Sequence, residues 1–143
     1  MPTFKNPADL KKHMEKMLTV GAQKKAEIVI TRATLLVQNE AKESLGKKGS
    51  GRIYQKYNQR RVHQASSAGD PPATDTGFLR SNITMNVKKR ANGAVVGQIV
   101  SAAPYSQALE FGTTTMMPRP FMTPALEKNR RKIQKLFKDT GVI

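Results

Sequence analysis

The chain of 143 residues has no cysteine and no tryptophan, and it has no long run of hydrophobic residues. Without cysteine, disulfides and thiolate metal sites are excluded. No stretch approaches the ~18 apolar residues of a membrane span, and residues 1–17 lack the apolar centre of a signal peptide. Hydrophobic residues make up only 38% of the chain, so we expect a small core or a fold that completes its burial against neighbours.

Acidic residues are scarce as well: there are 10 of them against 25 lysines and arginines, which gives a net charge of +15. The excess is concentrated in the two ends of the chain and in residues 49–64, whereas residues 65–124 are nearly neutral. Such an excess attracts polyanions or acidic protein surfaces, and charge alone does not distinguish between them.

Residues 7–45 predict one long helix or two collinear helices. Asn6 is a candidate N-cap, Pro7 fits the first helical position, and Gly46 is a candidate end. Gly21 marks a candidate kink or break within the stretch. Apolar and small residues recur every three or four positions and would form one helical face: Met14, Leu18, Ala22, Ala26, Val29, Ile30, Ala33, Val37, Ala41 and Leu45.

The remaining residues predict an α+β arrangement, with residues 1–143 as a single domain. Residues 46–73 are expected to form a flexible basic arm, whose isoleucine, valine and tyrosines favour a loose hairpin. Residues 74–143 predict, in order, a short helix (74–83), two strands (83–90 and 94–102) joined at Asn92-Gly93, a short helix (105–111), a proline loop and a C-terminal helix (125–138). The expected fold therefore packs the long N-terminal helix and the C-terminal helix on a small antiparallel sheet.

The faces of the shorter helices can also be assigned. The helix at 74–83 has three candidate caps, Thr74, Asp75 and Thr76, and three residues expected to point inward, Phe78, Leu79 and Ile83. The apolar positions of the C-terminal helix are Leu126, Ile133, Leu136 and Phe137.

Residues suited to catalysis or metal binding are few and scattered. His13 and His63 are far apart, and neither has the spacing of a metal ligand. Asp70 and Asp75 flank a Pro-Pro segment, where aspartate is typically a turn or cap residue. No nucleophile motif, phosphate-binding glycine loop or paired-acid motif is present. We therefore predict no catalytic, metal or cofactor-binding residues and no enzyme activity.

Glu110 stands alone among apolar neighbours in the segment LEFG. A buried carboxylate needs a partner, because an unpaired buried charge is costly. Arg119, between two prolines, or Arg80 could provide a bidentate ion pair. The alternative is that Glu110 is simply exposed.

The arm mixes cations with aromatic residues: Lys47, Lys48, Arg52, Tyr54, Lys56, Tyr57, Arg60 and Arg61. This pattern suits single-stranded nucleic acid through charge and stacking. It equally suits an arm that folds onto an acidic protein partner. A solvated charged surface is the third interpretation.

Two motifs in the second half of the chain lead to a known family. GDPPATDTGFLRSNI (69–83) precedes the predicted strands, and YSQALEFGT (105–113), followed by PRPFMTPAL (118–126), comes after them. In this order and spacing, the chain from about Gly51 to the C-terminus resembles the Hong Kong 97-type minor tail components of tailed bacteriophages. These are also called tail completion or head-to-tail joining proteins.

The resemblance implies a structural virion protein of the phage neck, made in the cytoplasm of the host bacterium. Members of the family are similar in fold to tail terminators, which assemble as rings, usually of six subunits. The expected partners are copies of the same chain, head-connector proteins (stopper or adaptor) and the tail-tube protein, with genomic DNA passing through the lumen. No enzyme activity, cofactor or membrane contact comes with the resemblance.

We expect the contacts with neighbouring subunits or partners at Arg52, Tyr54, Tyr57, Arg60, Arg61, Asp70, Arg80, Glu110, Phe111, Arg119 and Phe121. The charge of the chain supports an alternative function, that of a non-specific nucleic-acid-binding basic protein. Binding of that kind would weaken steeply as salt is added, because it depends on counterion release.

Overall fold

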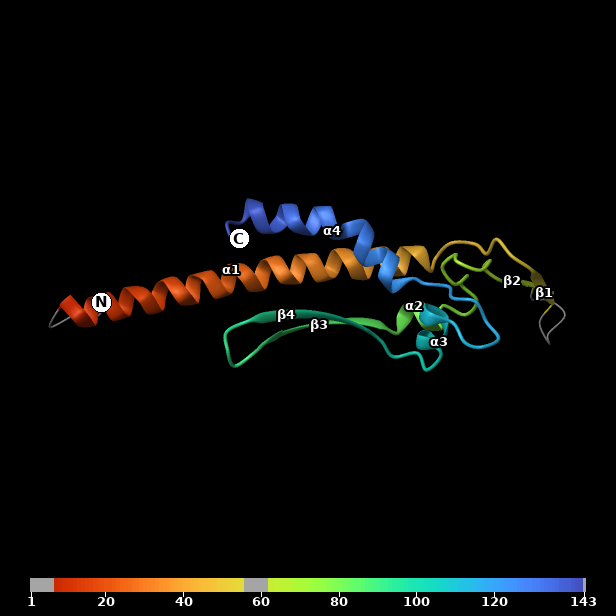
Figure 1. Ribbon diagram of the computed structural model, residues 1–143, viewed down its shortest axis with the longest axis horizontal. Coiled ribbons are helices and arrows are strands. Elements are labelled where there is room, and N and C mark those ends of the chain that lie inside the picture. The colour runs from red at the N-terminus through yellow and green to blue at the C-terminus, as the bar shows by residue number, and fades with distance from the viewer. Residues whose placement is uncertain (1–6, 56–61, 143) are drawn as a thin grey trace.

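A computed structural model describes residues 7–55 and 62–142 of the chain. Its longest element is a single helix, α1 (Pro7–Ser44), which runs along most of the molecule (Figure 1). Asp9 in the first turn and Lys42 in the last turn both favour the helix dipole. Gly21 neither ends nor divides the helix, so the prediction of one long helix is confirmed and that of two collinear helices is wrong.

The main sheet is an antiparallel hairpin of β3 (Ile83–Lys89) and β4 (Val95–Ser101). Its register pairs Ile83 with Ser101 and Lys89 with Val95. The predicted turn at Asn92-Gly93 is present: Gly93 has a φ of 82°, and the Arg90 N–H donates a 2.8 Å hydrogen bond to the Ala94 carbonyl. Glycine is favoured at such a left-handed position.

The described part of the arm forms a second antiparallel hairpin, β1 (Ile53–Gln55) and β2 (Val62–Gln64). Its base is tight, because a Cβ at Gly49 would overlap the carbonyl oxygen of Gln64. The Gly51 N–H donates a 2.8 Å hydrogen bond to the Ala65 carbonyl, and the Ala65 N–H donates one of 2.9 Å to Arg52. The hairpin expected in the arm is thus confirmed, but its base is closely packed and not loose.

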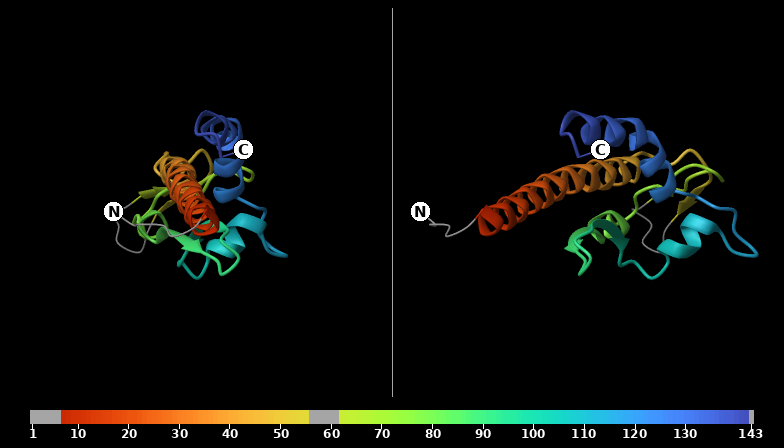
Figure 2. Two further views of the ribbon diagram at one scale, coloured as in Figure 1. Left: turned by 90° about the vertical axis from the view of Figure 1, so that its left-hand side faces the viewer. Right: turned by 60° about the vertical axis from the view of Figure 1, so that its left-hand side comes forward.

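Three further helices complete the fold: α2 (Phe78–Ser81), α3 (Ser106–Phe111) and α4 (Met122–Asp139). α4 lies antiparallel to α1 on one side, and the β3–β4 hairpin lies against the opposite side of α1 (Figures 1 and 2). This is the predicted α+β class, with the two long helices and small antiparallel sheets.

The core lies where the C-terminal half of α1 meets the start of β3 and the start of α4. Its buried residues are Val37, Ala41, Leu45, Ile83, Phe121 and Ala125. Buried Gln38 connects α1 to β3, because its side-chain amide nitrogen Nε2 donates a 3.0 Å hydrogen bond to the Ile83 carbonyl. A buried amide requires such a partner.

Several side chains lie differently from the prediction. Phe78 was expected to point inward and Leu126 was one of the apolar positions of the C-terminal helix, yet both are about half exposed, and α4 instead buries Ala125 and Asn129. The apolar face of α1 is buried only from Val29 onward. Ala125 belongs to the same core cluster as Val37 and Ala41 of α1, which places the neighbouring Leu126 at the edge of this contact.

The cap of α2 also differs. Gly77 is the N-cap residue, with a φ of 77°, and no side chain caps the helix. The Thr74 hydroxyl donates instead to the Leu45 carbonyl at the end of α1. Thr76 is the nearest of the three candidates to the predicted role, because its hydroxyl accepts a 3.3 Å hydrogen bond from the Phe78 N–H.

Candidate interface site

Glu110, in the last turn of α3, caps the N-terminus of α4 from outside that helix. Its Oε2 accepts hydrogen bonds from the backbone N–H groups of Phe121 (2.8 Å) and Met122 (3.0 Å). Its Oε1 accepts from both the N–H (2.8 Å) and the hydroxyl (2.7 Å) of Thr123. The carboxylate therefore satisfies N–H groups that a helix start otherwise leaves unpaired, at the positive end of the helix dipole.

This geometry corrects the ion pair expected for Glu110. Within residues 7–55 and 62–142, no ion pair joins Glu110 to Arg119 or Arg80. Burial by itself would raise the pKa of the Glu110 carboxyl, but the hydrogen bonds from Met122, Phe121 and Thr123 outweigh it and hold the pKa below its usual value. The partner of the Glu110 carboxylate is therefore the N-terminus of α4 and not an arginine.

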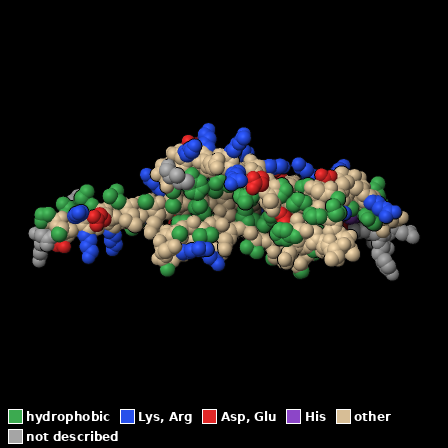
Figure 3. All heavy atoms as spheres, viewed as in Figure 1, with side chains coloured by type: hydrophobic (Ala, Val, Ile, Leu, Met, Phe, Trp, Pro, Cys, Tyr) green, Lys and Arg blue, Asp and Glu red, His purple; other side chains and the backbone are tan. Residues whose placement is uncertain are grey.

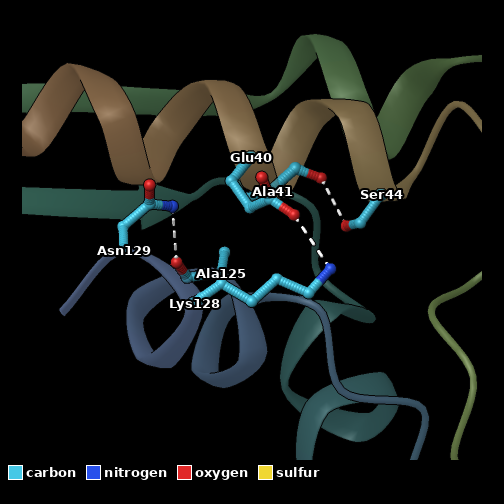
Figure 4. A network of polar contacts seen from close by, with 6 residues as sticks. All are labelled: Glu40, Ala41, Ser44, Ala125, Lys128 and Asn129. Atoms are coloured by element: carbon cyan, nitrogen blue, oxygen red, sulfur yellow. Dashed lines mark hydrogen bonds and ion pairs between the residues drawn. The ribbon is translucent and has the colours of Figure 1, made fainter. Parts of the chain in front are cut away.

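A polar contact also joins α4 to α1, as Figure 4 shows. The Lys128 ammonium donates a 2.9 Å hydrogen bond to Glu40 and lowers the pKa of that carboxyl. Nearby, Asn129 is buried and donates to the Ala125 carbonyl within α4. The ion pair is partly solvated, so a contribution of about 0.2–1 kcal/mol is expected.

Asp70 holds the base of the arm. Its Oδ2 accepts a 2.7 Å hydrogen bond from the Ser50 hydroxyl, and the Ser50 hydroxyl is also 3.1 Å from that of Ser67. Asp70 thus connects the segment that leads into the hairpin to the segment that follows it. This role agrees with the turn residue expected there.

The remaining arm residues of the expected interface divide into two groups. Arg52 and Tyr54 are exposed, and Tyr54 lies opposite His63 across the hairpin. Tyr57, Arg60 and Arg61 lie outside the described residues.

Phe111 of α3 and the proline-loop residues Arg119 and Phe121 occupy contrasting environments. Phe121 is only 1% exposed and belongs to the core, so its side chain offers no surface to a neighbour. Phe111 is 73% exposed at the end of α3. Arg119 is fixed by a 2.7 Å hydrogen bond from its N–H to the Leu109 carbonyl, and its side chain lines a pocket of about 270 Å³ together with Arg80 of α2.

Two apolar surfaces were not singled out from the sequence as contact surfaces. The first is the uncovered stripe, which we define as Leu10, Met14, Met17 and Leu18 in the N-terminal half of α1. The second is the apolar groove, a hollow of about 370 Å³ between α1, β4 and α4 whose lining includes Ile30, Val37, Ile99, Leu126, Ile133 and Phe137. Figure 3 shows hydrophobic side chains gathered between α4 and the β3–β4 hairpin.

The sequence did contain a signal for the uncovered stripe. The apolar face of residues 7–45 continues for its whole length, although the rest of the chain is too short of apolar residues to cover it. In the structure, α1 extends beyond both α4 and the hairpin (Figure 1). Gly141 and Val142, just past the end of α4, line a pocket with Met17 and Leu18 of the stripe and with Gly21 and Ala22.

Comparison with known proteins gives the family of the chain. A family model described as "Bacteriophage HK97-gp10, putative tail-component" matches residues 8–112. The chain belongs to this family of HK97-gp10-like phage tail components. The match covers α1, both hairpins and α3, whereas the proline loop and α4, which the sequence resemblance included, lie beyond it. No curated protein and no solved structure matched the chain.

Membership describes the chain as a tail component of a bacteriophage, which is a structural family and not a known family of enzymes. Among the described residues, no three His, Cys, Asp or Glu side chains are grouped as a metal site. None of the helices in that same part of the chain is long and apolar enough to cross a membrane.

Proposed function

We propose that this HK97-gp10-like protein is a ring-forming protein of the phage neck, which completes the tail tube and joins it to the head. The observation that carries this proposal is the uncovered stripe of α1. Leu18 is 72% exposed, and Leu10, Met14 and Met17 beside it are exposed as well. Their spacing of four, three and one residues puts them on one helical face, which is the arrangement of a helix that packs against another surface.

A second copy of the chain provides a suitable surface in the apolar groove. The stripe and the groove lie on different parts of the molecule, so stripe-to-groove contact between copies is heterologous, and heterologous contacts close into rings when the rotation between subunits permits. Leu126 at the edge of the groove is half exposed, which makes the groove accessible. Each subunit would then complete its own small core with a helix from the next.

The arm hairpin is suited to contacts beyond the ring. Ile53, Tyr54 and Val62 are all exposed on its short strands. A two-stranded hairpin is marginally stable alone, so contact with a head-connector protein or the tail tube would stabilise it. The hairpin and the free end of α1 lie at opposite ends of the molecule (Figure 1).

The net charge of +15 limits which faces of the chain can line the lumen of the ring. DNA that passes through a lumen must not be retained there, and a strongly basic lumen would retain it by attraction of phosphate. We therefore expect most lysines and arginines to face neighbouring proteins or solvent, and the lumen to be less basic than the outer faces. A ring structure with Arg60, Arg61 and the α4 lysines lining the lumen would contradict this arrangement.

Salt dependence separates ring assembly from the alternative of non-specific nucleic-acid binding. Subunits of charge +15 repel one another, so added salt should strengthen an apolar self-association by screening that repulsion. Binding to DNA should instead weaken by orders of magnitude between roughly 50 and 200 mM salt. Light scattering across this range, with and without duplex DNA, compares the two. A chain that stays monomeric at every salt concentration but binds DNA tightly at low salt would favour the alternative.

A further inference from the structure

The pocket at the base of the arm contains unused hydrogen-bond donors. It has a volume of about 270 Å³ and lies between the end of α1, strand β2, residues 72–80 and α3. Two polar atoms of its lining residues are buried without a hydrogen-bond partner, the Oγ of Ser66 and the Nε of Arg119. Ser66 is 4% exposed. Buried polar groups are almost always paired, so these two atoms require either an ordered water or a ligand group as partner.

A second arginine faces the same space. Arg80, on α2, also lines the pocket, and neither its guanidinium nor that of Arg119 forms an ion pair with any described residue. Asp75 is the acidic residue of the lining, and it already has an interaction of its own. The pocket therefore combines two unpaired guanidinium groups with a buried hydroxyl.

The shape of the pocket favours a carboxylate over the phosphate of DNA. Arginine forks match the planar oxygen pair of a carboxylate and also bind phosphate. A backbone phosphate, however, has a deoxyribose on each side, whereas an acidic side chain can enter a hollow end-on. The walls of this hollow include Leu45, Leu79 and Leu109, which suit the methylene groups of such a side chain.

We propose that this pocket binds a carboxylate presented by a neighbouring protein chain, with Arg119, Arg80 and Ser66 as its donors. The carboxylate is an acidic residue or a chain end of an adjacent subunit or tail partner. For this source alone, the proposal rests on the proposed assembly. The PRPF loop is then a recognition element, because its two prolines hold Arg119 at the pocket while its phenylalanine anchors the loop in the core.

The pocket can be tested without any partner, by titrating the full chain with acetate. The readout is the Nε–H resonances of arginine in a ¹H–¹⁵N spectrum at about pH 7.5, where a carboxylate such as acetate is fully ionised. Chloride at equal ionic strength, the neutral isostere acetamide and inorganic phosphate are the comparison titrants. Acetate should shift the Arg119 and Arg80 resonances saturably, and chloride and acetamide should not.

Variants make the assignment specific. Arg119→Gln should weaken acetate binding at least tenfold, as measured from the Arg80 Nε–H resonance. Arg80→Gln should weaken it equally, as measured from the Arg119 Nε–H resonance. Arg80 is exposed, so Arg80→Gln should fold normally even if Arg119→Gln does not. Arg130→Gln is the matched control, since Arg130 is exposed and lies on α4 beside Glu127. Equal shifts with acetate and chloride, or saturation by phosphate alone, would overturn the proposal.

Ring assembly is measured separately on the same variants. A chain that binds acetate but never assembles would contradict the proposed ring while the carboxylate pocket stands. A chain that assembles but shows no acetate response would contradict the pocket while the ring stands. If Arg80→Gln abolishes self-assembly, the carboxylate belongs to another copy of the chain. Normal self-assembly by a variant that no longer binds acetate assigns it to a different tail or head protein.

Discussion

Gly97 in β4 lies against Thr34 in α1 so closely that a Cβ at position 97 would overlap the Thr34 hydroxyl oxygen. The Thr34 hydroxyl is held in place, because it donates a 2.7 Å hydrogen bond to the Ile30 carbonyl one turn earlier. Gly97 therefore sets the distance between the long helix and the sheet, and this distance also shapes the apolar groove, to which both residues contribute.

Substituting Gly97→Ala should lower the free energy of unfolding by about 1–3 kcal/mol, the usual cost of overpacking a fitted contact. Gly21→Ala is the matched control. Nothing lies within 4 Å of a Cβ there, so the change should stabilise α1 by about 0.5–1 kcal/mol through helix propensity. Urea unfolding measures both. Equal stability of the two variants would mean that the close contact is absent.

Glu110→Ala should destabilise the chain by about 1–2 kcal/mol, the range for loss of a helix cap. Glu110→Gln keeps an acceptor oxygen but loses the charge, so a smaller loss is expected. Glu127→Gln serves as control, because Glu127 is exposed and its ion pair is with Arg130, three residues along α4. Thermal unfolding compares the three variants, and a Glu110→Ala protein as stable as the parent would contradict the capping role.

The Glu110 carboxyl should also make stability depend on acid. Its pKa is lower in the folded chain than in the unfolded chain, so the folded state favours the charged form. The stabilisation is fully present above the unfolded pKa, about 4.3 for glutamate, and is lost as the pH falls through the folded value. Unfolding followed from about pH 6 to 3 should show a smaller acid loss in Glu110→Gln than in the parent.

Self-assembly should depend on the apolar side chains of the uncovered stripe. Met14→Gln with Leu18→Gln should raise the concentration needed for self-association at least tenfold while leaving the melting temperature nearly unchanged, because both side chains are exposed in the single chain. Met117→Gln is the control, because Met117 is similarly exposed but lies in the proline loop and not on α1. A large fall in melting temperature would instead show that the stripe is covered within one chain.

The arm hairpin should change its protection on assembly. Its described strands are three residues long and mostly exposed, so amides of residues 53–55 and 62–64 should exchange quickly in the free subunit and slowly in the assembled particle. Mass spectrometry of hydrogen exchange can follow peptides from this segment. If these amides were already fully protected in the free subunit, docking could not be the cause of their protection.

The elements themselves were predictable, because each depends on local sequence. Pro7 and the repeating apolar positions predict α1, Asn92-Gly93 predicts the hairpin turn, and Gly112 ends α3. The partners of individual side chains were not predictable. Glu110 was expected to meet an arginine, but its partner is a helix N-terminus whose position depends on how the proline loop returns, 11 to 13 residues later in the chain.

The sequence by itself determined the family, the order of helices and strands, and the shortage of apolar residues relative to the length of α1. Those features depend on local propensity and composition, which tertiary contacts do not alter. Only the tertiary structure decided which half of α1 is covered, that Phe121 is buried while Phe111 is exposed, and that Arg80 and Arg119 meet at one pocket. The reason is that burial and charge pairing depend on distances between segments far apart in the chain, and periodicity within a segment does not encode those distances.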